Sequence, residues 1–510
     1  MKNEQYYLKV SRYSDLEDKN ERILYRFLEM LTGLISWSIL ILAILCSYFY
    51  PLLAASAIVI YAVYWFLRSI YFSVHLRSGY AKMKKVEKID WLGKLDNPNI
   101  YHLIVIPTYD ESEKILRNTI QSIAKNDYPL NKMILVLAFE ERAGEAAIQK
   151  ANILKKEFEG VFFRVLTTFH PKDIPGEIAG KSSNEAWATK IAKKEVIDKL
   201  NIPYENVVLT SLDSDTIVYP KYFSRLTYLY LTVDNPTRSS FQPVPLYINN
   251  IWEASPVSRI FAFSSTFWHT INQERPEKLV TFSSHSMSFK ALLDIDFKQT
   301  NVVSEDSRVF WQCFLKYDGD YKTVPMYYPV SMDANAAPTF IQTVANIYKQ
   351  TRRWAYGVEN VPYFIFGFIK NKKIPMSKKI SMLIEMIEGR VSWAVAPTLI
   401  FLLGWLPFFL GKEEFSETVA SHSLPLVLSR ILTFAMIGLI GSAYLSILLL
   451  PPRPLEYSRS KVLVFLFQWV LVPFTMIFFS ALPALDAQTR FMLGKYMGFW
   501  PTPKFRRNVA

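Results

Sequence analysis

Cysteine is nearly absent from this chain, which has only Cys46 and Cys313 among its 510 residues. One lies in an apolar run and the other in the body of the sequence. Two isolated cysteines cannot build a disulfide scaffold or a cysteine metal site, so both are excluded.

The basic motifs of nucleic-acid-binding proteins are also missing. The formal net charge is +13 and aromatic residues make up 15% of the chain. No Lys/Arg run and no alternation of basic with aromatic residues accompanies this charge. We therefore expect no nucleic-acid partner. The positive charge instead suits a cytoplasmic membrane face and anionic substrates.

Charged residues are almost lacking from residues 31–50 and 52–74, which Pro51 separates. Each stretch can cross a hydrocarbon core of about 30 Å, since that takes about 20 residues. The segment before them, 1–30, is too long and too mixed for a secretory signal peptide. We expect a transmembrane hairpin over 31–75, although a buried helical hairpin would also fit. Basic residues flank the pair and none lies at the joint, which predicts cytoplasmic ends in a multi-pass plasma (inner) membrane protein.

Short apolar runs alternate with helical periods from Tyr101 to about Asp333, which is typical of a βαβ sheet domain. We place this α/β domain at residues 90–335. Its first four strands are expected at His102–Pro107, Lys132–Phe139, Val161–Thr167 and Asn206–Asp215.

Acidic and polar residues follow these strands, at the sheet edge where α/β proteins bind ligands. Asp213 and Asp215 end the fourth strand, and two such carboxylates suit a hard divalent cation. A strand end followed by an ordinary turn explains the same pair. Glu305 and Asp306 begin a later helix, where helix capping by carboxylates is the plain alternative.

The region after the sheet domain contains Gln350, Arg353 and Trp354, followed by an amphipathic stretch at Ser377–Arg390. We assign 336–390 to helices at the membrane interface, with domain packing as the alternative. Three further spans are expected within 391–484, at Val391–Leu410, Leu424–Leu450 and Val462–Ala481. Five spans would leave the tail at 485–510 outside, yet this tail is basic. The side of the tail therefore stays open.

Five motifs stand in the order seen in membrane-integrated family 2 glycosyltransferases, which include cellulose, chitin and hyaluronan synthases. The motifs are Ile106-Pro-Thr-Tyr-Asp-Glu111, Gly180-Lys-x-x-Asn184, Asp213-x-Asp215, Glu305-Asp306 and Gln350-x-x-Arg353-Trp354. The chain resembles this family over about residues 100–360. The resemblance implies a GT-A domain, with a Rossmann-like mixed sheet, inserted between transmembrane helices.

The resemblance also implies roles for single residues. Asp215, supported by Asp213, would hold Mg²⁺ or Mn²⁺, and Asp306 would be the general base, with Glu305 beside it. Gln350, Arg353 and Trp354 would bind the acceptor and the diphosphate. The donor-binding residues would be Pro107, Tyr109, Glu111, Glu140, Lys181, Asn184 and Asp213.

One position departs from the family pattern. Members commonly end the second strand in an Asp pair that binds uridine, whereas this chain has Glu140-Glu141. A glutamate accepts the same hydrogen bonds with a longer side chain, so UDP remains the default nucleotide.

The expected activity is transfer of a sugar from a nucleoside diphosphate sugar to an acceptor hydroxyl at the cytoplasmic face, with inversion. Processive synthesis of a polysaccharide and transfer of one sugar to a lipid acceptor are both open. An alternative hypothesis from another functional class is a non-catalytic membrane scaffold that has kept the fold and lost the donor site.

Overall fold

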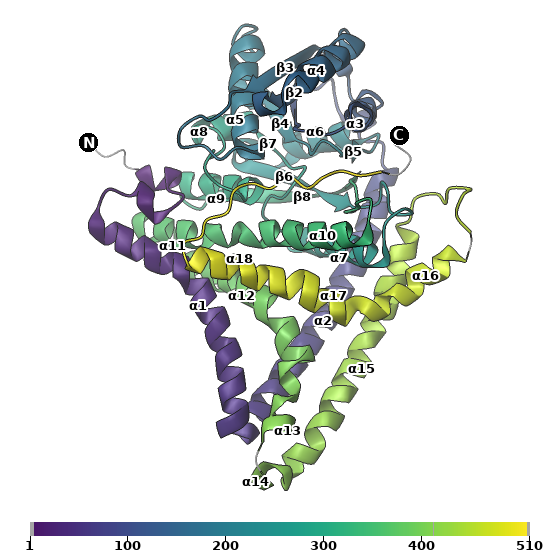
Figure 1. The fold of residues 1–510 in the computed structure, drawn as a ribbon. Helices are drawn as coiled ribbons and strands as arrows, with labels where there is room; N and C mark the ends of the chain where they lie inside the picture. The colour runs from purple at the N-terminus through teal and green to yellow at the C-terminus, as the bar shows by residue number, and fades with distance from the viewer. Residues whose placement is uncertain (1–4, 412, 459, 507–510) are drawn as a thin grey trace.

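The computed structural model describes residues 5–411, 413–458 and 460–506. Residues 1–4 and 507–510, which belong to the terminal segments expected at 1–30 and 485–510, lie outside the described residues. A sheet domain stands at one end of the molecule, long apolar helices extend from the other, and a layer of helices separates them (Figure 1).

The sheet domain is built on an eight-stranded mixed sheet of order β3-β2-β1-β4-β7-β6-β8-β5. The strands β3, β2, β1 and β4 run parallel, with His102 opposite Met133 in the β1–β2 pair. The strands are β1 (Tyr101–Pro107), β2 (Met133–Glu140), β3 (Arg164–His170), β4 (Val207–Ser211), β5 (Ile217–Val218), β6 (Ser239–Leu246), β7 (Ser286–Ser288) and β8 (Lys322–Ser331).

Alternation along the strands builds an apolar core on each face of the sheet. Leu103 and Val105 of β1 belong to one core, and Ile104 and Ile106 to the other. The helices that cover the two faces are α3 (Glu113–Ala124), α4 (Glu145–Phe158), α5 (Lys181–Ala192), α6 (Tyr222–Thr232), α7 (Pro256–Gln273), α8 (Phe289–Asp294) and α9 (Glu305–Lys316).

This is the fold class expected from the sequence, a GT-A-type α/β domain with a mixed sheet inserted between apolar helices. The third expected strand is displaced, because β3 begins at Arg164 rather than Val161. The fourth is shorter than expected, since β4 ends at Ser211 and leaves both aspartates in the loop that follows.

Two strands carry internal prolines. Strand β6 contains Pro243 and Pro245, and β8 contains Pro325 and Pro329. Proline gives no N–H to a ladder and normally argues against a strand. Their pairing is irregular for this reason, with a register shift between Gln242 and Val244.

Helices between the sheet and the apolar end form the intermediate layer (Figure 1). The stretch Ser377–Arg390, expected as a separate interface helix, is continuous with the apolar residues that follow it in α12. The layer contains α10 (Phe340–Ala355), α11 (Asn360–Lys370), the start of α12 (Met376–Phe401), α16 (Lys461–Phe467), α17 (Val472–Met476) and α18 (Leu482–Met492).

Four helical runs among the described residues are long and apolar enough to cross a membrane: α1 (Lys19–Phe49), α2 (Pro51–Lys88), α15 (Val419–Leu448) and the broken run Lys461–Met492. A fifth candidate is α12 followed by α13 (Leu406–Leu410), bent by 47°. The remaining helix, α14 (Glu413–Ser416), lies at the far tip.

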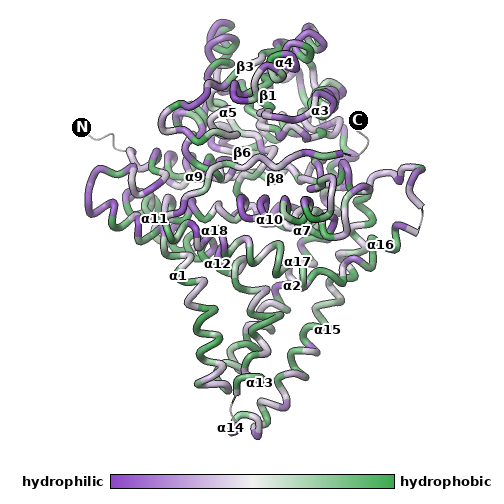
Figure 2. The backbone as a smooth tube through the Cα atoms, viewed as in Figure 1, coloured by the Kyte–Doolittle hydropathy of each residue, from purple (hydrophilic) through white to green (hydrophobic). Residues whose placement is uncertain are grey.

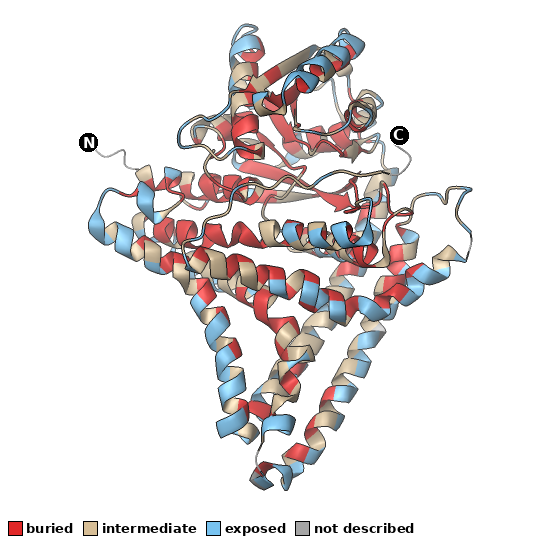
Figure 3. Cartoon of the chain, in the orientation of Figure 1, coloured by how far each residue is buried: buried red, intermediate tan, exposed pale blue. Residues whose placement is uncertain are grey.

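Apolar residues cover the outside of the extended helices (Figures 2 and 3). Ile60 of α2 and Ile440 of α15 are both 71% exposed. Large exposed apolar surfaces of this kind mark contact with a membrane or a partner. The run α16–α18 has a different direction, because it lies across the base of the sheet domain (Figure 1).

Candidate active site

The carboxyl ends of the parallel strands open into one cavity of about 2030 Å³. Most residues singled out from the sequence line it: Pro107, Tyr109, Glu111, Glu140, Lys181, Asp213, Glu305, Asp306, Gln350, Arg353 and Trp354. They come from six separate segments of the chain. Asn184 and Asp215 are fully buried beside the cavity and do not line it.

Lys181, at the start of α5, joins the two acidic motifs. Its Nζ donates to Asp213 Oδ1 at 2.8 Å and to Asp306 Oδ2 at 2.9 Å. Burial opposes the charged ammonium, but the surrounding carboxylates outweigh this and hold the pKa of Lys181 well above its ordinary value. The same pairing keeps the pKa of Asp213 below its ordinary value despite burial. Both groups therefore stay charged at neutral pH.

Glu305 and Asp306 are neighbours with opposite protonation behaviour. Burial first, and then the Asp306 carboxylate, raises the pKa of Glu305 to about 8. Burial acts on Asp306 too, but Lys181 and Lys298 outweigh it and lower the pKa of Asp306. At neutral pH Glu305 is protonated and Asp306 is ionised, which is the state a general base needs.

His285 and Lys298 complete the surroundings of Asp306. His285 Nδ1 lies 3.6 Å from Asp306 Oδ1, and Lys298 Nζ lies 3.9 Å from the same oxygen. Lys298 also pairs with the buried carboxylate of Glu185. Sequence reasoning missed both residues, because neither belongs to one of the five motifs. The only signal was that Lys298 precedes Glu305 by seven positions, and no signal marked His285.

The carboxyl-terminal segment 495–506, which we call the tail segment, crosses the sheet domain next to the site (Figure 1). Its Lys504 Nζ donates to Asp215 Oδ2 at 2.7 Å, and Asp333 N donates to the same oxygen at 3.0 Å. Arg506 binds both oxygens of Asp333. The sequence analysis identified this segment only as part of the basic tail at 485–510, without a contact to Asp215.

The residues fit a divalent cation at Asp215 and Asp213. Asp215 Oδ1 is buried and has no hydrogen-bond partner, and carboxylate oxygens are the ligands that Mg²⁺ and Mn²⁺ prefer. Among the described residues no group of three or more His, Cys, Asp or Glu side chains is arranged to hold a metal ion. The remaining ligands would therefore be substrate oxygens and water.

Helix α10 brings Gln350, Arg353 and Trp354 to the cavity. The Nε atom of Arg353 is buried without a partner, and its guanidinium lies 4.8 Å from the centre of the Phe499 ring. Gln350 Oε1 accepts from Asn335 Nδ2 at 3.1 Å. Trp354 stacks on Phe261 with ring centres 5.3 Å apart.

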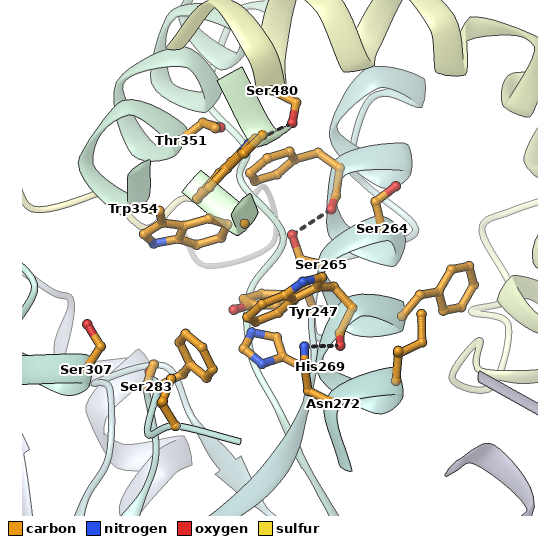
Figure 4. Close-up of a pocket in the computed structure, with 18 of the residues that line it drawn as sticks. Tyr247, Ser264, Ser265, His269, Asn272, Ser283, Ser307, Thr351, Trp354 and Ser480 are labelled. Carbon is orange, nitrogen blue, oxygen red and sulfur yellow. Dashed lines mark hydrogen bonds between the residues drawn. The ribbon is translucent and has the colours of Figure 1, made fainter. Parts of the chain in front are cut away.

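Aromatic and polar side chains surround the space next to Trp354, and Figure 4 shows Trp354, Tyr247 and His269 around this part of the cavity. His269 is packed edge-on against Trp268 and Phe282, and burial lowers its pKa to about 3. The imidazole is therefore neutral. Flat apolar rings with a few polar atoms suit the faces and hydroxyls of a sugar.

At the end of the cavity next to β1 and β2, Arg142 pairs with Glu140 and lies 4.4 Å above the ring of Tyr109. Glu111 accepts from Thr108 Oγ1 and from Tyr109 N, and so fixes the turn after β1. Asn184 Nδ2 donates to Ala138 O at 2.7 Å and braces the end of β2. Asn184 thus supports this end of the cavity from behind its wall.

No family model matches the chain, and no curated protein matches it. Among solved structures it is similar to the mannosyltransferase PcManGT from Pyrobaculum calidifontis in complex with GDP-Man and Mn²⁺, with 14% identity and a TM-score of 0.42 over 76% of this chain and 99% of that chain. It is also similar to S. aureus TarS 1–349 in complex with UDP, with 12% identity and a TM-score of 0.35 over 68% of this chain and 90% of that chain. Likeness this low leaves the activity to be argued from the residues of the chain itself.

Proposed function

We propose that the chain is a membrane glycosyltransferase of the family 2 type, which transfers a sugar from a nucleoside diphosphate sugar to an acceptor hydroxyl with inversion. The observation that carries this proposal is the position of Lys181 between Asp213 and Asp306. The Lys181 ammonium, which can bind a diphosphate, thereby lies next to Asp306, the ionised base.

The chemistry follows from the charges around the cavity. Asp306 takes the proton of the acceptor hydroxyl, whose oxygen forms the bond to the anomeric carbon. The bond from that carbon to the diphosphate oxygen breaks, and the nucleoside diphosphate leaves with the electron pair. Arg353, which has no carboxylate partner among the described residues, and Lys181 stabilise the developing negative charge. A divalent cation at Asp215 and Asp213 would add Lewis-acid stabilisation of the same diphosphate.

The domain is proposed to face the cytoplasm. Basic residues stand in the last turns of α2 on the domain side, and the short loop at Tyr50 and Pro51 has none. With α16–α18 lying across the domain, the crossing helices are α1, α2, α12–α13 and α15. Four crossings return the basic tail to the domain side.

The test is a panel of nucleotide sugars offered to purified protein in lipid with Mn²⁺, followed by measurement of nucleoside diphosphate release. We expect release with at least one donor. The variant Asp306→Asn should lose about 10²–10⁴-fold in turnover while still binding the donor, because only the base is removed.

Asp96→Asn is the matched control, since Asp96 is exposed and does not line the cavity. Turnover of this variant should equal that of the parent. If the folded protein neither hydrolyses a donor nor transfers its sugar, the enzyme proposal fails. The hypothesis of a non-catalytic membrane scaffold then takes its place.

A further inference from the structure

The cavity continues far beyond the catalytic residues. It extends from Asp213 and Asp306 to the helices α2, α15 and α17 at the apolar end of the molecule. Its volume of about 2030 Å³ is more than the roughly 300–1,000 Å³ of an ordinary ligand pocket. A nucleotide sugar therefore leaves a large part of the space to a second occupant.

The wall changes character along a single helix. Residues of α12 that line the cavity are polar near its start, where they include Ser381, Glu385 and Glu388. Further along they are apolar, with Ala396, Ile400 and Phe401. The cavity thus has a polar half next to the sheet domain and an apolar half among the extended helices.

The apolar half is lined by one face of α15 together with α2 and the run α16–α17. The lining residues there are Phe66, Leu432, Ala435, Met436, Leu439, Ile440, Phe467, Val470 and Met476. Sugar hydroxyls placed against this wall would lose hydrogen bonds to water and gain none. A hydrocarbon chain loses nothing there and is removed from water.

Several of the wall residues are largely exposed. Ile440 of α15 is 71% exposed, Phe467 of α16 is 72% exposed, and Val470 is 79% exposed. All three also line the cavity. The cavity therefore opens sideways between α15 and α16–α17, at a surface whose apolar composition suits the bilayer.

Polar partners lie where the two halves meet. Arg68 of α2 pairs with Glu388 of α12, and Trp393 Nε1 donates to Ser480 Oγ at 2.9 Å. Arg390 also lines the cavity, and no ion pair to it occurs within the described ranges. A polar head group would find hydrogen bonds at this level.

We propose that the apolar half binds the hydrocarbon chain of a lipid acceptor, which enters from the bilayer between α15 and α16–α17. Its hydroxyl-bearing head lies in the polar half and reaches Asp306. This inference rests on the proposed glycosyltransferase function and assigns the acceptor class to it. The cavity then serves as an acceptor site for one lipid at a time.

The first test measures binding, so that it does not depend on transfer. The full-length protein in phosphatidylcholine nanodiscs is irradiated with a hexadecyl glucoside that carries a photoreactive diazirine in its chain. Peptides with adducts are then found by mass spectrometry. We expect adducts on cavity-facing residues of α15 and α17, and competition by unlabelled hexadecyl glucoside. Adducts spread evenly over all lipid-facing helices would overturn the proposal.

The second test measures transfer to octyl, dodecyl and hexadecyl glucosides with the donor found active in the panel. The KM for the acceptor should fall with chain length, by up to about fourfold for each CH₂ that becomes buried. Leu439→Trp fills the apolar half and should raise the KM for hexadecyl glucoside at least tenfold. It should raise the KM for octyl glucoside much less.

Leu426→Trp is the matched control, because Leu426 lies on the same helix, is 54% exposed, and does not line the cavity. It should leave the dependence on chain length unchanged, which separates cavity binding from partitioning into the bilayer. If both variants behave alike, or if the products are long glycans inside sealed vesicles, the proposed lipid site is wrong. The proposal that the protein is a transferase then still holds. If no donor is consumed, the transferase fails, and the photolabelling result alone decides whether a lipid binds.

Discussion

At the scale of single residues, the contrast between Glu305 and Asp306 has a consequence for stability. The carboxyl of Glu305 is buried and lies beside an ionised neighbour, whereas Asp306 is held by Lys181 and Lys298. A group whose pKa is raised in the folded state contributes stability below its unfolded pKa and loses it as the pH rises through the folded value. For Glu305 this loss runs from pH 4.5 to about 8.

Glu305→Gln should therefore flatten the pH dependence of stability. Gln keeps the neutral shape of the protonated side chain and cannot ionise. Relative to the parent, the variant should gain on the order of 4 kcal/mol between pH 5 and pH 8.5. Thermal unfolding in detergent at the two pH values measures this. If the unfolding temperature changes with pH by the same amount in variant and parent, Glu305 ionises normally in the folded protein.

At the scale of elements, the tail segment places a positive charge where the proposed cation would bind. Lys504 Nζ bonds Asp215 Oδ2, and the other oxygen of that carboxylate has no partner. A cation and this ammonium would compete for the same carboxylate. The tail segment must then shift when the cation binds.

Lys504→Met should strengthen binding of Mn²⁺ alone by several fold, because it removes the competing charge. Calorimetric titration with Mn²⁺ in the absence of nucleotide measures the effect. Lys495→Met is the control, since Lys495 lies in the same segment with an exposed side chain. Unchanged or weaker Mn²⁺ binding in Lys504→Met would mean that Lys504 does not compete.

Close packing between α2 and α7 ties the extended helices to the sheet domain. A Cβ added at Gly79 would lie 2.7 Å from the carbonyl oxygen of Thr270, closer than atoms of this kind approach. Gly79→Ala should therefore cost about 1–3 kcal/mol of unfolding free energy.

The matched control is Gly389→Ala, since a Cβ at this helical position meets nothing within 4 Å. That substitution should be neutral or gain up to about 1 kcal/mol through helix propensity. Thermal unfolding of the two variants side by side tests the comparison. Equal stabilities would show that the α2–α7 contact can relax.

At the scale of the whole molecule, the path of the chain decides where its ends lie. The helices α1, α2, α15 and α12–α13 extend away from the sheet domain, and α16–α18 lies across it (Figure 1). Both ends of the described chain are consequently on the side of the domain.

Reporter fusions test this arrangement in cells. Green fluorescent protein fused to the carboxyl terminus should fluoresce, and alkaline phosphatase inserted after Ser416, at the far tip, should be active. Alkaline phosphatase at the carboxyl terminus should be inactive, because the tail stays with the sheet domain. Phosphatase activity at the carboxyl terminus would mean that the run Lys461–Met492 crosses the membrane.

Local patterns were enough to predict much of the sheet and to single out many of the residues that line the cavity. Strands β1 and β2 are buried apolar runs, which are easy to recognise because both faces of the sheet are covered. Strands β6 and β8 were not predicted, since prolines interrupt them and their irregular pairing depends on neighbours far along the chain.

The sequence by itself determined which side chains are available: the carboxylates, the Gln-x-x-Arg-Trp residues, and apolar helices on either side of a sheet. Each is a property of residue type and spacing. Only the tertiary structure decided that Lys181 joins Asp213 to Asp306, that Lys504 returns to Asp215, and that α16–α18 lies across the domain. These contacts join segments that are 32 to 289 positions apart. Since local patterns carry no information on such pairs, packing of the whole chain has to bring them together.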